Sequence, residues 1–74
     1  MNEHIKTITV KEAHELLKRY SGGYLGEDDR GRFLVAESDG TFTAIDNSTG
    51  DCWTEDFKTR FEAVKYLYGI GREV

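Results

Sequence analysis

Proline is missing from the sequence, cysteine occurs once, and no long apolar run is present. Cys52 alone forms no internal disulfide, which is typical of proteins in a reducing cytoplasm. No stretch approaches the roughly 20 apolar residues of a membrane helix. The first residues also lack the basic and apolar regions of a signal peptide. We therefore expect a cytoplasmic protein with no membrane partner, and its folding is not slowed by a prolyl isomer.

Positive charge is also scarce. Lys and Arg total 10 against 14 Asp and Glu, so the net charge is −4. Phosphate backbones repel a negative chain, which makes nucleic acid a poor candidate partner.

Chemical motifs are scarce too. Cys52 lies between Asp51 and Trp53, an acidic setting that disfavours a thiolate nucleophile. His4 and His14 do not have the spacing of metal ligands. The sequence has no nucleotide-binding loop either, so we expect no enzymatic activity, no metal and no cofactor.

The 74 residues suffice for one small domain. We expect this domain to span residues 1–74, with residues 1–7 and 71–74 frayed at its ends. Hydrophobic residues make up 38% of the chain and charged residues 32%, which is ordinary for a globular protein.

The spacing of apolar residues predicts an α+β fold. A capping box at Thr9 and Glu12 starts a helix that reaches about Tyr20 and ends at Gly22 and Gly23. Three strands then form an antiparallel meander over residues 32–57, and Thr59 caps a second helix that ends at Gly69. Residues 5–10 allow a short N-terminal strand. The expected order is helix, meander, helix, with both helices on one face of the sheet.

The turns set the predicted register of the meander. Asp39-Gly40 is typical of a two-residue hairpin loop, which pairs Glu37 with Phe42. A four-residue loop over residues 47–50 pairs Ala44 with Trp53. One face of the sheet then carries Phe33, Val35, Phe42, Ala44, Trp53 and Phe57, and the other carries Leu34, Ala36, Ile45 and Cys52.

Two arrangements of these faces remain open. Carboxylates ring the aromatic face, and buried carboxylates are costly, so the helices would cover the aliphatic face and leave the aromatic face exposed. Alternatively, the aromatic residues form the core because they bury the most area. The apolar stripe of the second helix is predicted to consist of Phe61, Val64, Leu67 and Tyr68. Tyr66 lies outside this stripe and could anchor a partner. The candidate partner-binding residues are Phe33, Phe42, Trp53, Glu55 and Tyr66.

Several segments resemble known families. The helix, meander and helix over residues 9–68 resemble the double-stranded RNA-binding domain, which implies a basic cluster near Lys58, Arg60 and Lys65. The segment from Thr59 to Ala63 is similar to the start of the last helix in Hic-type antitoxins. Residues 44–47, 53–57 and 61–63 resemble small acidic α/β proteins encoded by phages and mobile elements of Gram-positive bacteria. That resemblance brings no catalytic residues with it.

These observations favour a non-catalytic protein–protein interaction module that uses an aromatic sheet face with an acidic rim. Its partner is a protein of unknown identity, or a second copy bound through the sheet. The alternative is an acidic inhibitor that mimics nucleic acid and binds a basic host protein. A divergent RNA-binding or antitoxin-like domain is a third option.

Overall fold

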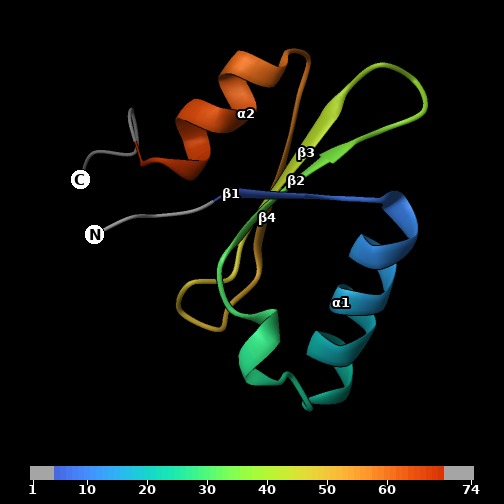
Figure 1. Ribbon diagram of the computed structural model, residues 1–74, viewed down its shortest axis with the longest axis vertical. Helices are drawn as coiled ribbons and strands as arrows, with labels where there is room; N and C mark the ends of the chain where they lie inside the picture. The colour runs from blue at the N-terminus through green and yellow to red at the C-terminus, as the bar shows by residue number, and fades with distance from the viewer. Residues whose placement is uncertain (1–4, 70–74) are drawn as a thin grey trace.

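The computed structural model describes residues 5–69. Their order along the chain is strand, helix, short helix, three strands and helix (Figure 1). The elements are β1 (Ile5–Ile8), α1 (Val10–Gly22), the 3-10 helix η1 (Glu27–Asp29), β2 (Arg32–Ala36), β3 (Phe42–Asp46), β4 (Trp53–Phe57) and α2 (Arg60–Leu67). The fold is α+β, as expected.

The sheet has four strands in the order β1, β2, β3, β4. β2, β3 and β4 form the predicted antiparallel meander. β1 pairs in parallel with β2, so the sheet is mixed. A parallel pair needs a crossover connection, and α1 supplies it. Residues 5–7 are therefore paired in the sheet, where fraying was expected, whereas residues 1–4 and 71–74 lie outside the described residues.

Both helices begin at the predicted threonines. The Thr9 hydroxyl accepts from the backbone N–H of Glu12 at 3.0 Å, and the Glu12 carboxylate accepts from the Thr9 N–H at 2.9 Å. At α2, the Thr59 hydroxyl accepts from the Glu62 N–H at 3.1 Å. α1 ends at Gly23, whose φ of 79° is the left-handed geometry that glycine adopts without strain.

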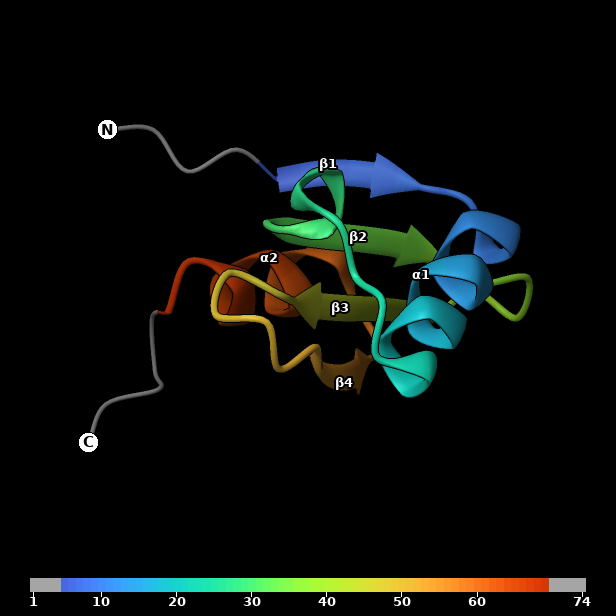
Figure 2. The same cartoon turned by 90° about the horizontal axis from the view of Figure 1, so that it is seen from below.

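The two helices cover opposite faces of the sheet, which corrects the prediction that they share one face. Figure 2 shows α1 in front of the sheet and α2 behind it. The α1-face core consists of Ala13, Leu16, Phe33, Val35, Ile45 and Cys52. The α2-face core consists of Leu34, Ala44, Ala63 and Leu67. Each helix is too short to cover a whole face, but together they bury apolar residues on both.

The first hairpin loop explains why the predicted faces were wrong. Gly40 has a φ of 90°, and its N–H donates to the Glu37 carbonyl at 3.1 Å. The Glu37 N–H donates to the Thr41 carbonyl at 2.9 Å, so Ser38, Asp39 and Gly40 form a three-residue loop. This loop pairs Ala36 with Phe42, one residue away from the predicted pair. A one-residue shift exchanges the faces of β2 relative to those of β3 and β4.

The second loop is longer than predicted because Asn47 organises it. Asn47 is fully buried, and its side-chain amide donates to the Asp29 carbonyl at 2.6 Å. Its side-chain oxygen accepts from the Cys52 N–H at 3.2 Å. The loop therefore runs from residue 47 to residue 52, and Asp46 pairs with Trp53. Because the shift is two residues, the side chains of β3 and β4 still share faces as predicted.

Candidate functional site

β4 is an edge strand, and it is the most exposed strand of the meander. Its residues from Trp53 to Asp56 are all exposed, and only Phe57 is half-buried. In contrast, the middle of β2 and most of β3 lie between the two helices and are buried. β4 pairs with β3 on one side, and no described strand pairs with its other side. Its outer side therefore presents backbone N–H and C=O groups without ladder partners.

Trp53 is the exposed large apolar residue of β4, and 59% of its surface is accessible to solvent. It lies opposite Asp46 of β3, on the α2 side of the sheet. Asp46 is buried and forms an ion pair with Arg32, with 3.4 Å between Nε and Oδ2. The Asp46 carboxylate also accepts from the N–H and the hydroxyl of Ser48. These polar contacts hold the Asp46 side chain in place beside Trp53.

The structure separates the predicted site residues. Phe33 is 5% exposed and belongs to the α1-face core, so it lies on the other side of the sheet from Trp53. Phe42 and Tyr66 are half-buried beside the α2-face core. The ring of Tyr66 packs on Phe57 with 5.4 Å between the centroids. Trp53 and Glu55 alone among the five are exposed, and both lie on the α2 side of β4.

The carboxylates predicted to ring the aromatic face are divided between the two faces of the sheet, with Asp46 and Glu55 on the α2 side and Glu37 beside Thr43 on the α1 side. The Thr43 hydroxyl lies 2.8 Å from a carboxylate oxygen of Glu37 and 2.8 Å from one of Asp56. A hydroxyl has one proton, so it donates to one of the two carboxylates at a time. Glu55 points to the opposite face, next to Trp53. The edge strand therefore carries carboxylates on both of its faces.

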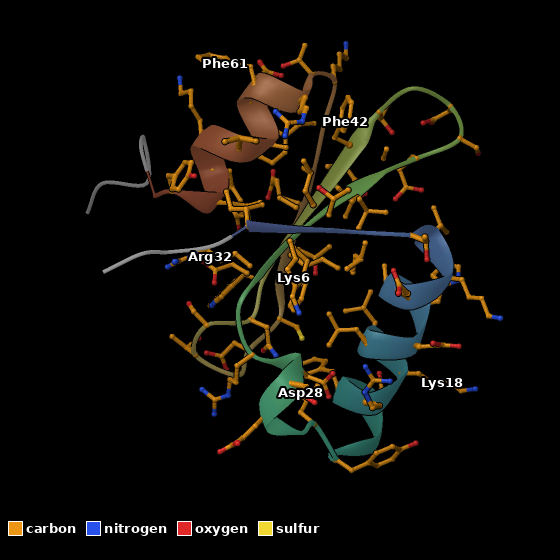
Figure 3. The ribbon with its side chains drawn as sticks, in the orientation of Figure 1. Lys6, Lys18, Asp28, Arg32, Phe42 and Phe61 are labelled. Atoms are coloured by element: carbon orange, nitrogen blue, oxygen red, sulfur yellow. The ribbon has the colours of Figure 1, made fainter. Side chains whose placement is uncertain are left out.

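Phe61 and Tyr68 are exposed aromatic residues that the sequence pattern had assigned to the buried stripe of α2. Phe61 is 71% exposed, and Figure 3 shows it pointing away from the sheet. The Lys65 ammonium lies 5.5 Å from the centre of its ring. The buried residues of α2 are instead Ala63 and Leu67. Their four-residue spacing places both on one side of a helix, and this spacing is the feature of the sequence that could have identified the buried side.

Cys52 carries the only thiol of the chain. Burial raises the pKa of the Cys52 thiol, and the carboxylates of Asp29 and Asp51 raise it further. This thiol is therefore poorly suited to act as a thiolate nucleophile. Within residues 5–69, no three His, Cys, Asp or Glu side chains come close enough together to hold a metal ion. In the same range, neither helix has the length and apolar character needed to cross a bilayer.

Comparisons with family models, with curated proteins and with solved structures find no match to this chain. The proposals that follow therefore rest on the geometry of the described residues.

Proposed function

We propose that this protein is a non-catalytic protein–protein interaction module that binds an extended basic segment along β4. The observation that carries the proposal is the open edge of β4, with Trp53 and Glu55 exposed on one face and Thr54 and Asp56 on the other. An exposed sheet edge accepts a partner strand through main-chain hydrogen bonds, while alternate side chains provide specificity.

The charges of the edge select a basic partner. Asp51, Glu55 and Asp56 lie along or just before β4, and all three are exposed. Opposite charges on directly paired strands stabilise a sheet, so lysine or arginine opposite Glu55 is favoured. The exposed indole of Trp53 adds apolar area and attracts a neighbouring cation through its ring face.

The same charges disfavour the homodimer through the sheet. Two copies of β4 that pair antiparallel over all five residues place Trp53 opposite Phe57 and Glu55 opposite the second copy's Glu55. Like charges directly opposite each other destabilise a strand pair. A different protein with a basic strand therefore fits this edge better than a second copy does.

The acidic mimic of nucleic acid is the weaker alternative. Lys58 and Arg60 follow β4 directly, and both are exposed. These cations interrupt the run of negative charge that a basic nucleic-acid-binding protein would recognise.

The test uses two short synthetic peptides, one of alternating lysine and valine and one of alternating glutamate and valine. We expect the lysine peptide to shift the backbone amide signals of residues 53–57 in two-dimensional NMR spectra, and the glutamate peptide to leave them unchanged. The variant Glu55→Lys should weaken binding of the lysine peptide and strengthen binding of the glutamate peptide. Trp53→Ala should weaken binding of the lysine peptide, because the exposed apolar area and the attraction of the ring for a cation are lost.

Lys18→Glu is the matched control, because Lys18 lies on α1 and points away from the sheet (Figure 3). This variant also changes the sign of one charge, yet it should bind both peptides as the wild type does. Equal binding of the two peptides, or shifts confined to residues outside β4, would refute the proposal.

A further inference from the structure

An open cleft lies at the opposite edge of the sheet from β4, between β1, α1 and η1. Its volume is about 270 Å³. Ile8, Leu16 and Phe33 form its apolar floor, and charged side chains of Lys6, Glu15 and Asp28 stand around it. Lys6 and Phe33 are direct neighbours across the β1–β2 pair, so the ammonium rises beside the apolar floor.

One wall of the cleft is held in place by Asp29. Its carboxylate accepts from Nε of Arg19 at 2.9 Å and from a terminal guanidinium nitrogen at 2.7 Å. It also accepts from the Gly26 N–H at 2.9 Å. The two bonds from Arg19 fasten η1 to α1, and a paired guanidinium of this kind is a strong, oriented contact. The bond from Gly26 is local to η1 and holds the start of this short helix. The cleft therefore has a fixed shape.

Three charged side chains of the cleft, those of Lys6, Glu15 and Asp28, form no hydrogen bond and no close ion pair with any residue that the structure describes. Glu15 lies near enough to Arg19 for their opposite charges to attract each other, and Arg19 also lines the cleft. Glu12, in contrast, is engaged at the start of α1. Figure 3 shows Lys6 extending from β1 toward the side where α1 and η1 lie, with Asp28 on η1. An ammonium and two carboxylates thus face a common space from three different elements.

We propose that this cleft binds a small zwitterion whose ammonium and carboxylate are joined by a short aliphatic chain. The ligand carboxylate pairs with Lys6, its ammonium pairs with Asp28 and Glu15, and its methylene groups lie on Phe33 and Leu16. The cleft volume of about 270 Å³ lies just below the range of roughly 300–1,000 Å³ that is usual for ligand sites, which suits a ligand of this small size. Charge-assisted bonds to both ends distinguish such a ligand from a simple amine or acid.

The probe is aminocaproate, compared with caproate, which lacks the ammonium, and hexylamine, which lacks the carboxylate. Because the cleft is open and the ligand small, we expect a dissociation constant of about 1 mM for aminocaproate. NMR titration should show shifts at the amides of Leu16 and Phe33. Caproate and hexylamine should each bind about tenfold more weakly, since each loses one charged contact.

Two variants separate the two ends of the ligand. Lys6→Gln should weaken aminocaproate about tenfold and leave hexylamine unchanged, whereas Asp28→Asn should weaken both of these molecules. Lys18→Gln is the control for loss of a lysine charge outside the cleft. The proposal is overturned if aminocaproate causes no shifts, if it binds no more tightly than both analogues, or if Lys6→Gln leaves its affinity unchanged. β4 lies on the other edge of the sheet, so failure here leaves the proposed function standing.

Discussion

Asp29 is the residue whose ionisation matters most for the packing of η1 on α1. The hydrogen bond from Arg19 lowers the pKa of the Asp29 carboxyl below its ordinary value, and the bond from the Gly26 N–H lowers it further, against the opposing effect of burial. Because the folded-state pKa is depressed, the charged form stabilises the fold. That stabilisation is present above the unfolded pKa of about 3.9 and is lost as the pH falls through the folded-state value.

We expect Asp29→Asn to lower the free energy of unfolding at pH 7 by about 1–3 kcal/mol, because a charge-assisted pair is lost. The difference from the wild type should shrink in acid, since protonation removes the same pair from the wild type. Urea unfolding at pH 7 and at successively lower pH measures both effects. A difference that stays constant across this range would contradict the role given to Asp29.

At the scale of elements, α2 is the segment that closes the second face of the sheet. Leu67 is fully buried in the α2-face core, against Leu34 and Ala44. We expect Leu67→Ala to cost about 2–5 kcal/mol, because it leaves a cavity under the helix. Trp53→Ala, on the exposed edge strand, should change the free energy of unfolding by no more than about 1 kcal/mol. Thermal or urea unfolding compares the two variants, and similar losses would mean that Trp53 belongs to the core.

The elements and the antiparallel order of β2, β3 and β4 could be predicted from the sequence, but the exact register, the parallel pairing of β1 and the face that each helix covers could not. Thr9 and Thr59 mark both helix starts because capping is chemistry within four residues of chain. The side of the sheet that each helix covers depends on β1, whose four residues carry a weak alternating pattern. Because β1 pairs in parallel with β2, α1 has to cross one face of the sheet, and that leaves the other face for α2.

Only part of the candidate site could be predicted from the sequence, because strand register decides which side chains share a face and local sequence leaves that register open. Asp39-Gly40 fits a two-residue loop and a three-residue loop equally well as a local sequence, and the choice between them exchanges the faces of neighbouring strands. This error joined Phe33 to Trp53 and Phe42 in one predicted surface. Asn47 lengthens the second loop through contacts with Asp29, 18 residues away, which local spacing does not reveal. Trp53 and Glu55 remained in the site because they lie on the exposed part of the edge strand β4.

At the scale of the whole molecule, Glu55 is expected to keep the open sheet edge from pairing with a second copy. We expect the wild type to be monomeric, and Glu55→Thr to form weak dimers with a dissociation constant of ~1 mM or lower, because the like-charge contact is gone and threonine favours strands. Sedimentation equilibrium at high protein concentration makes the comparison. Glu27→Thr, on exposed η1, is the control for the loss of one negative charge.

Two results would conflict with this role of Glu55. A wild-type dimer that dissociates in the Trp53→Ala variant would show that the edge pairs with itself despite the charge. Equal self-association of Glu55→Thr and Glu27→Thr would show that net charge, rather than the position on β4, controls association.

Hydrogen exchange at β4 tests the central claim most directly, because strand addition protects the backbone amides that do not bond to β3. The measurement follows the exchange of the amides of residues 53–57 with and without the peptide of alternating lysine and valine. We predict that the outward-facing amides of β4 exchange quickly in the free protein and slow down when the peptide is bound. Unchanged exchange along β4 with bound peptide, or protection that appears at Phe61 and Tyr68 instead, would contradict the proposal that this edge is the binding surface.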